Sequence, residues 1–377
     1  MKVGILTLPL TDNYGGIMQC VALYRYLQSN GHEVTLINKD FYQETAVWKK
    51  IANYILIKLP FHDFKNVKSN YIKHKEKIER SKVHKSFITN EIYSISEKVR
   101  TYDEIKGLAR SHKFDAVIVG SDQVWRRFYI QTDRYYQNYF LDFLNDEECL
   151  KISYAPSFGK NGWEGKNDVS EISKLLMNFD AVSVRESSGL HTCEQTFGLE
   201  NIQHVLDPTL LMNENFYKSI LNNYDVSSIN SKGLVSYVLD EAKAKEEIIK
   251  NLESKLNLKD KLHLKGFGKE SKYYSIPEWI FAISESKFVV TDSFHGMVFS
   301  IIFKKDFIVI GNADRGLERF VSLLSILGLE DRLVGHSSDL EYRNIVPIDY
   351  VEVEKVLQRY KTKSIQFLEK ALSDEKY

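Results

Sequence analysis

Short apolar runs alternate with segments of helical periodicity along most of this 377-residue chain. The first run spans Lys2–Leu8, and apolar residues then recur at helical spacing from Ile17 to Leu27. Gly31 suits the end of that helix, and Glu33–Asn38 is the next apolar run. A strand-helix-strand unit of this kind places its strands parallel in one sheet, with helices on the faces of the sheet. The sequence therefore predicts an α/β fold from its N-terminus onward.

The alternation runs through two halves of the chain. After the first unit, further strands are predicted at 114–119, 151–154, 181–184 and 202–206, and then, beyond a polar stretch, at 233–239, 263–265, 287–291 and 307–310. A chain of this length exceeds one ordinary core. We therefore expect an N-terminal Rossmann-like domain at 1–212, a second at 233–350 and a C-terminal helix at 351–377. A ligand is expected in the cleft between the two domains.

Composition excludes several classes of protein. Lysine plus arginine equals aspartate plus glutamate, at 51 each, so no overall charge directs the chain to nucleic acid. The three cysteines (Cys20, Cys149 and Cys193) lack metal-ligand spacing, and we expect them to be reduced. The chain enters a strand at once, without the pattern of a signal peptide, and no run approaches the roughly 20 apolar residues of a membrane-spanning helix. A cytoplasmic protein is the expectation.

A basic, aromatic insertion at about 41–100 interrupts the alternation. Within residues 41–90, eleven basic residues stand against four acidic ones, a net charge of +7. Val47–Phe61 is apolar, aromatic and flanked by lysines. Two interpretations remain open. The segment forms a helix in the inner membrane interface, giving peripheral membrane contact, or it packs on the first domain with its lysines in solvent.

Two polar loops follow predicted strands of the first domain. Asn13–Gly16 contains two glycines next to a helix start, which suits close approach of a ligand to backbone but also a plain tight turn. Gly120–Trp125 contains Asp122, which either holds a ligand hydroxyl or caps a helix. Trp125 in the same loop either stacks on a ligand ring or belongs to the core.

Three arginines are candidates for binding an anion. Arg185 leaves a predicted strand, where its planar guanidinium could grip a carboxylate or phosphate, or pair structurally with Glu186. Arg315 and Arg319 lie one helical turn apart and could face one ligand. Surface pairing with Glu318 is the alternative for those two.

The turn Thr291–Gly296 joins a short apolar strand to an apolar helix. It would present His295 at the carboxyl end of a sheet, where α/β folds bind ligands. An imidazole exchanges protons near neutral pH, and the helix start from Ser293 to Gly296 could hold an anion. A capping turn with an incidental histidine is the other interpretation.

Six segments, in this order, resemble the polysaccharide pyruvyl transferase family. They are Asn13-Tyr14-Gly15-Gly16 with Gln19, Gly120–Trp125, Ser153–Gly159, Val184–Ser188, Asp207-Pro208-Thr209 and Thr291–Gly296. The resemblance extends over about residues 2–335. It implies two Rossmann-like domains facing a cleft, as in B-type glycosyltransferases. It also implies transfer of a pyruvyl group from phosphoenolpyruvate to a sugar of an exopolysaccharide or capsule precursor, with phosphate release and a ketal product.

The resemblance also implies roles for individual residues. His295 matches the family's general acid, and Arg185 matches the arginine that holds the donor. Many members carry an arginine where this chain has Ser293, and we hypothesise that Arg315 or Arg319 replaces it. Asp122 is our candidate for the base that accepts the hydroxyl proton. The remaining candidates are Gly296 and Ser293 on the donor side, and Asn13, Tyr14, Gly15, Gly16 and Trp125 on the acceptor side.

The proposed chemistry needs a proton donor, cations and a base, so we expect no metal and no cofactor beyond phosphoenolpyruvate as co-substrate. The expected partner is a glycan acceptor, either free or lipid-linked, and not a nucleic acid. Two other functions fit the same sequence: a B-type glycosyltransferase with a nucleotide-sugar donor, and a non-catalytic glycan-binding subunit.

Overall fold

The computed structural model describes residues 1–42, 65–144, 149–165, 167–230, 233–240, 242–258, 260–265, 273–312, 316–335, 339 and 345–373. Two features singled out in the sequence, Val47–Phe61 and Arg315, lie outside these ranges.

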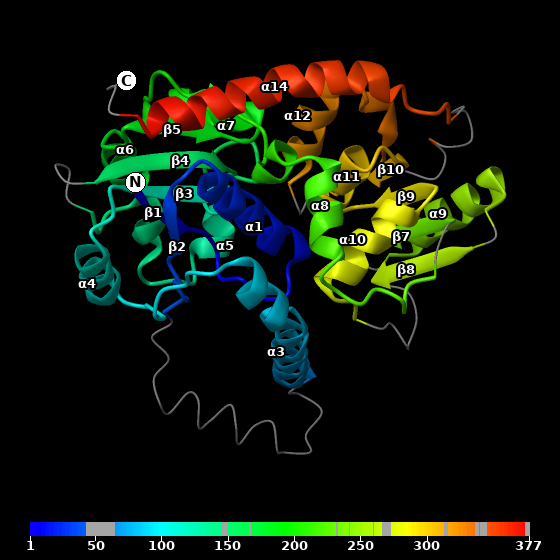
Figure 1. Ribbon diagram of the computed structural model, residues 1–377, viewed down its shortest axis with the longest axis horizontal. Helices are drawn as coiled ribbons and strands as arrows, with labels where there is room; N and C mark the ends of the chain where they lie inside the picture. Colours follow the sequence, from blue (N-terminus) through cyan, green and yellow to red (C-terminus); the bar gives the residue numbers. More distant parts are fainter. Residues whose placement is uncertain are drawn as a thin grey trace.

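The N-terminal half is built on a six-stranded parallel sheet (Figure 1). Its strands are β1 (Lys2–Leu6), β2 (Glu33–Leu36), β3 (Ala116–Asp122), β4 (Leu150–Pro156), β5 (Ala181–Val184) and β6 (Gln203–His204). They lie in the order β2-β1-β3-β4-β5-β6, and every neighbouring pair is parallel. Strand β3 is buried at every position, as expected of a central parallel strand covered on both faces.

Helices connect these strands and cover the sheet. They are α1 (Tyr14–Ser29), α3 (Lys65–Glu91), α4 (Tyr102–His112), α5 (Arg127–Ile130), α6 (Val169–Leu176) and α7 (Ser187–Phe197), with short 3₁₀ helices η2 (Tyr136–Phe140) and η3 (Pro208–Leu211). Helix α1 follows β1 directly, so its N-terminus lies at the carboxyl edge of the sheet.

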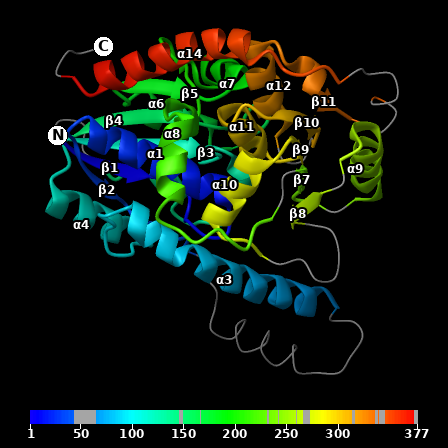
Figure 2. The same ribbon diagram turned by 45° about the vertical axis from the view of Figure 1, so that its right-hand side comes forward.

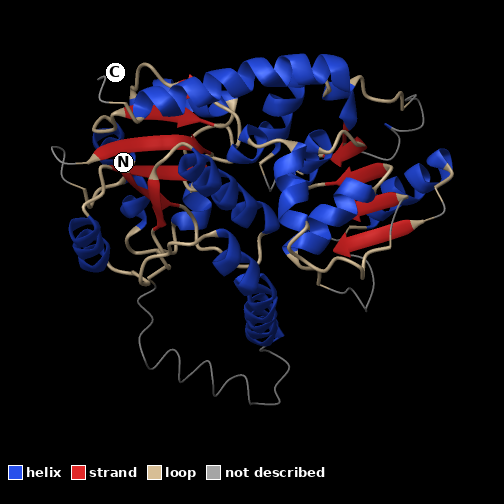
Figure 3. Ribbon diagram, viewed as in Figure 1, coloured by secondary structure: helices blue, strands red, loops and turns tan. Residues whose placement is uncertain are grey.

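The C-terminal half repeats the architecture with five parallel strands (Figure 3). The strands are β7 (Leu234–Tyr237), β8 (Lys261–Lys265), β9 (Phe288–Thr291), β10 (Asp306–Ile310) and β11 (Leu333–Val334), in the order β11-β10-β9-β7-β8. The helices are α9 (Lys243–Leu256), α10 (Ile276–Glu285), α11 (Phe294–Ile302) and α12 (Leu317–Leu327), with η5 (Glu330–Arg332). The prediction of two Rossmann-like α/β domains is confirmed.

The last helix, α14 (Tyr350–Ala371), returns from the second half across the first (Figure 1). The hydroxyl of Ser364 accepts a hydrogen bond of 2.9 Å from the backbone N–H of Leu206. The rings of Phe367 and Tyr154 are 6.3 Å apart. At the other end of the helix, the Tyr350 hydroxyl donates to the Ser300 carbonyl of the second half at 3.4 Å, so α14 contacts both halves.

Four α-helices of the described ranges, α3, α5, α7 and α8, occupy segments that sequence reasoning did not assign as helical. Helix α3 lies in the basic insertion and runs along one side of the molecule (Figure 2). Helix α8 (Glu214–Leu221) lies in the polar stretch between the domains, where the side chain of Asn213 caps it by accepting from the N–H of Phe216. Tyr217, Ile220 and Leu221 form its buried face at spacings of three and four residues, and this stripe was hidden by the polar residues around it.

Candidate active site

A cavity of about 530 Å³ lies where the carboxyl ends of strands from both sheets meet. The N-terminal half contributes the chain from Thr7 to Tyr14 and the end of β3. The C-terminal half contributes the turn from Asp292 to His295 and the first turn of α12. Ligands of α/β proteins bind at such strand ends, so the predicted cleft is present and is lined by both halves.

The turn after β9 is held by its own polar side chains. The Thr291 hydroxyl accepts from the N–H of Ser293 at 3.0 Å and donates to the Tyr237 carbonyl at 2.7 Å. The Ser293 hydroxyl caps α11 by accepting from the N–H of Gly296 at 3.3 Å. Ser293 therefore stabilises the helix start, and the N–H of Gly296 is occupied by this cap. The turn places His295 on the cavity wall.

Gly15 makes room for His295. A Cβ on Gly15 would lie 1.9 Å from Nδ1 and 2.2 Å from Cγ of the imidazole. The first turn of α1 and the first turn of α11 therefore meet through a glycine and a histidine ring. The expectation that Gly15 lies against a ligand is therefore wrong. The space left by its lack of a side chain is filled by the ring of His295. Its neighbour Gly16 does line the cavity.

Asp207 contacts the imidazole from the other side. Its Oδ2 lies 3.4 Å from Nε2 of His295 and 2.5 Å from Nη1 of Arg185. Its Oδ1 accepts from the hydroxyl of Thr209 at 2.6 Å. Burial alone would raise the pKa of Asp207, but the nearby His295, Arg185 and Thr209 lower that pKa below its ordinary value. A buried carboxylate thus faces one nitrogen of the histidine.

Arg185 lies behind the cavity, not on its wall. Besides Asp207, it faces Asp122 at 3.6 Å and Glu186 at 3.9 Å. Burial alone would lower the pKa of Arg185, but Asp207, Asp122 and Glu186 raise it above its ordinary value. Arg185 therefore makes the structural pair with Glu186 that was the alternative interpretation, and it also orders the carboxylates of Asp207 and Asp122. Its predicted contact with the donor stays a prediction.

Arg319 brings a guanidinium to the cavity wall, from the first turn of α12. Burial and then the charge of Arg185 lower its pKa to about 10. Phe294 lies between the two arginines, with its ring centre 4.7 Å from the guanidinium carbon of Arg185 and 5.3 Å from that of Arg319. Arg319 therefore lines the same cavity as Ser293 and His295, and its hypothesised role in place of an arginine at position 293 stays a prediction.

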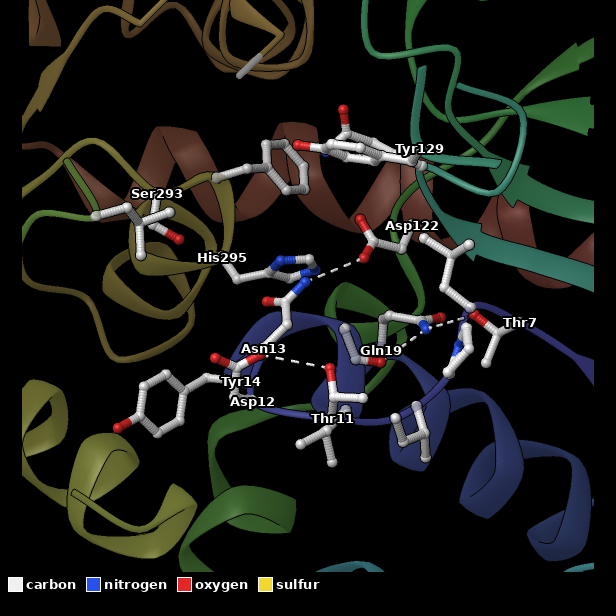
Figure 4. A pocket seen from close by; sticks show the side chains of 18 of the residues that line it. Thr7, Thr11, Asp12, Asn13, Tyr14, Gln19, Asp122, Tyr129, Ser293 and His295 are labelled. Carbon is white, nitrogen blue, oxygen red and sulfur yellow. Dashed lines mark hydrogen bonds between the residues drawn. The ribbon is translucent and has the colours of Figure 1, made fainter. Parts of the chain in front are cut away.

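Asp122 faces the cavity from the end of β3 (Figure 4). Its backbone has a left-handed φ of 65°, which is uncommon for a residue other than glycine and concentrates at functional sites. One carboxylate oxygen accepts from the side-chain amide of Asn13 at 3.3 Å. Figure 4 shows the side chains of Asp122, Asn13 and His295 directed toward the same space.

Two aromatic candidates have structural roles. Trp125 is fully buried, stacks on Phe140 at 5.6 Å and donates from its indole N–H to the carbonyl of Tyr139. Its assignment as a ligand-stacking residue is wrong, because the ring lies in the core. Tyr14 stacks on Trp279 at 5.4 Å, and its hydroxyl donates to the carbonyl of Tyr274. Tyr14 touches the cavity but chiefly anchors one domain to the other.

Sequence reasoning gave no role to two residues that the structure brings to the site. Gln19 is buried, and its amide bridges the Thr7 hydroxyl, the Gly16 carbonyl and the N–H of Ser121. Asp207 is the carboxylate beside His295. Asp207 could have been found by its position, because Asp-Pro closes a strand at the same sheet edge as the other loops.

These features define a class: a two-domain Rossmann-like α/β protein with a histidine, a carboxylate and an arginine around an interdomain cavity. The model of the polysaccharide pyruvyl transferase family matches residues 13–315. The chain belongs to the polysaccharide pyruvyl transferase family and is a transferase.

A comparison with curated proteins gave no match. Among solved structures, the chain is similar to UDP-GlcNAc 2-epimerase from Neisseria meningitidis bound to UDP-GlcNAc, at 10% identity and a TM-score of 0.49, covering 98% of this chain and 100% of that one. It is also similar to Arabidopsis thaliana UGT89C1 complexed with UDP-L-rhamnose, at 10% identity and a TM-score of 0.49, covering 99% and 100%. The fold assignment rests on the strand orders given above.

None of the helices in the described ranges is long and apolar enough to cross a membrane. Within the same ranges, no three or more His, Cys, Asp or Glu side chains are grouped as metal ligands. The expectation that the reaction needs neither metal nor cofactor stays a prediction.

Proposed function

We propose that this protein transfers the pyruvyl group of phosphoenolpyruvate to two hydroxyls of one sugar in an exopolysaccharide or capsule precursor. The products are a cyclic pyruvate ketal and phosphate. The observation that carries the proposal is that His295, Asp122 and Arg319 line one cavity in a chain of this family. A cytoplasmic location, where phosphoenolpyruvate is made, belongs to the same proposal.

His295 is the proton donor in this account. Its Nε2 faces Asp207, and its ring lines the cavity beside Gly15. The imidazolium gives its proton to the methylene carbon of phosphoenolpyruvate, and the adjacent carbon becomes an oxocarbenium-like centre. The Asp207 carboxylate faces Nε2 and orients the ring, as a carboxylate does for a histidine in acid-base catalysis.

Asp122 is the base. It accepts the proton of the first sugar hydroxyl while the hydroxyl oxygen bonds to the oxocarbenium-like carbon. The carbon–oxygen bond to phosphate then breaks, and the second hydroxyl closes the ketal, its proton leaving with phosphate. The proton delivered to the methylene carbon is balanced by the one taken from the first hydroxyl, so no oxidant or reductant is needed.

Arg319 holds the negative charge of the donor. A guanidinium pairs with a carboxylate or phosphate through two parallel hydrogen bonds. Its nearly complete burial strengthens such a pair, because less water screens it. Arg185 acts behind it by holding the carboxylates of Asp207 and Asp122 in place, at 2.5 Å and 3.6 Å from its guanidinium nitrogens.

Thermal melting with candidate donors tests this function. Phosphoenolpyruvate at about 100 times its Kd should stabilise the fold by about 2.7 kcal/mol, whereas UDP-sugars should not shift the melting temperature. Stabilisation by a UDP-sugar alone would instead indicate a glycosyltransferase. No shift with either donor would indicate a glycan-binding subunit. Phosphate release from phosphoenolpyruvate over a panel of glycans then identifies the acceptor.

A further inference from the structure

Ser121 immediately precedes Asp122 at the end of β3, and it is fully buried. The described residues that line the active-site cavity do not include Ser121. Its hydroxyl nevertheless lies among the charged groups behind the cavity wall. Any effect of Ser121 on the reaction therefore acts through the groups that it contacts.

The backbone of Ser121 is fixed on both sides. Its N–H donates to Oε1 of Gln19 at 3.0 Å, and its carbonyl accepts from the hydroxyl of Thr7 at 3.4 Å. The amide of Gln19 is itself held, because Nε2 donates to the Thr7 hydroxyl at 3.1 Å and to the Gly16 carbonyl at 2.8 Å. Figure 4 shows the bond between Gln19 and Thr7. The hydroxyl of Ser121 is therefore carried by a rigid part of the chain.

The hydroxyl of Ser121 lies between a backbone carbonyl and a carboxylate. Its Oγ is 3.0 Å from the carbonyl oxygen of Ala155 and 3.3 Å from Oδ2 of Asp207. Nη1 of Arg185 donates toward the same Oγ at 3.5 Å. A hydroxyl both donates and accepts, so Ser121 belongs to one hydrogen-bonded group with Arg185 and Asp207.

Oδ2 of Asp207 is also the oxygen that faces the imidazole. It lies 3.4 Å from Nε2 of His295, beyond the usual hydrogen-bonding distance. The other oxygen, Oδ1, accepts from the hydroxyl and the N–H of Thr209 at 2.6 Å and 3.0 Å. The place of Oδ2 is therefore set by Arg185 and Ser121, and a small shift of this oxygen decides how closely it approaches the ring.

We propose that Ser121 is a positioning residue for the proton-donating step: its hydroxyl fixes Oδ2 of Asp207 and thereby sets the orientation of the His295 ring. This inference rests on the proposed function and adds to it a residue that touches neither donor nor acceptor. Asp122, the proposed base, follows Ser121 directly, so the acid and the base are placed from one point of β3.

Turnover of two variants tests the proposal, measured as phosphate release from phosphoenolpyruvate with an accepting glycan. Ser121→Ala and Ser121→Cys should each lower turnover by about tenfold to 100-fold, the usual effect of removing a group that orients a functional side chain from behind. The Kd for phosphoenolpyruvate should stay the same in both. The thiol fills the space of the hydroxyl but bonds weakly, so it separates the hydrogen bond from packing.

Ser153→Ala is the matched control. It removes an equally buried hydroxyl on the neighbouring strand, whose bonds go to the backbone of Ser183 at 3.0 Å and 3.1 Å. This variant should keep the turnover of the wild-type protein. An equal loss of turnover in Ser153→Ala and Ser121→Ala would reduce the role of Ser121 to stability of the sheet and overturn the proposal.

Two further measurements show whether Ser121 acts through Asp207 and His295. In an Asp207→Asn background, Ser121→Ala should lower turnover by less than about threefold, whereas independent effects would multiply. The nitrogen NMR signals of the His295 ring, assigned with His295→Gln, should move in Ser121→Ala and stay in place in Ser153→Ala.

Multiplied effects in the double variant, wild-type turnover in both Ser121 variants, or unmoved His295 signals would each overturn the assignment. A wild-type protein that releases no phosphate with any glycan, and that phosphoenolpyruvate does not stabilise, would refute the proposed function instead. The NMR signals of His295 would then still show whether Ser121 orients the ring.

Discussion

The imidazole of His295 lies directly on Gly15, so a catalytic candidate from one half of the molecule is seated on a glycine of the other half. A methyl group at position 15 would overlap the ring, and the ring would have to move. The packing of the two halves against each other and the position of His295 therefore depend on the same contact.

Gly15→Ala is expected to lower turnover by about tenfold to 100-fold while leaving donor affinity nearly unchanged, because a displacement of about 1 Å is costly in catalysis. Steady-state kinetics and phosphoenolpyruvate titration on the same sample measure the two effects. Gly107→Ala is the control: Gly107 lies in α4 with no atom near its missing side chain. Full turnover in Gly15→Ala would show that the imidazole position is not critical.

Arg319→Gln should weaken binding of phosphoenolpyruvate by about tenfold to 100-fold, because a charged hydrogen-bonded pair contributes about 1.5–3 kcal/mol. Arg319→Lys should recover only part of this affinity, since an ammonium lacks the planar fork. Calorimetric titration with phosphoenolpyruvate measures both variants. An unchanged Kd for phosphoenolpyruvate in Arg319→Gln would show that Arg315 or another residue binds the anion.

Arg185→Lys should chiefly reduce stability. The guanidinium faces three carboxylates in a buried setting, and a lysine cannot contact all of them. Breaking such a buried cluster costs about 3–5 kcal/mol. A clear fall in melting temperature without donor is therefore expected. A variant with wild-type melting temperature and weak donor binding would instead place Arg185 in direct contact with the donor.

The lowered pKa of His84 predicts that the free energy of unfolding depends on pH in the acidic range. Burial lowers the pKa of His84 to about 4 from 6.5, and its Nε2 lies 2.8 Å from the Tyr273 hydroxyl. Between pH 6.5 and 4 the unfolded chain binds a proton at this residue that the native protein does not bind. The contribution of the neutral His84 side chain to the free energy of unfolding is about 3 kcal/mol. It is therefore fully present above pH 6.5 and is lost as pH falls toward 4.

Melting curves from pH 8 to pH 4 check this. His84→Gln should lose less stability than the wild-type protein over the lower part of the range. His191→Gln, a change at an exposed position of α7, should follow the wild-type curve. Parallel curves for all three proteins would show that His84 does not titrate differently on folding.

The parallel strands were predictable because their residues are buried on both faces and stand out as apolar runs, as in Ala116–Asp122. The turn before His295 was predictable for a similar local reason, since Thr291 and Ser293 provide the polar side chains that hold it. Helix α3 was not predicted, because its lysine-rich sequence lacks a strong apolar stripe.

The less predictable part of the site depends on tertiary contacts. Nothing in the sequence shows that Asp207 meets His295, because 88 residues separate them and they come from different halves. Whether Arg185 faces a ligand or three carboxylates is likewise decided by folding. Trp125 was ambiguous for the same reason: a loop tryptophan after a strand can turn outward or, as here, into the core.

The most direct test of the central claim is the rate of phosphate release from phosphoenolpyruvate, with an accepting glycan, by the wild-type protein and by His295→Gln. If His295 protonates the methylene carbon, the variant should bind phosphoenolpyruvate but release phosphate about 100-fold to 10,000-fold more slowly, the usual contribution of general acid catalysis. A His295→Gln protein that releases phosphate at the wild-type rate would contradict the account.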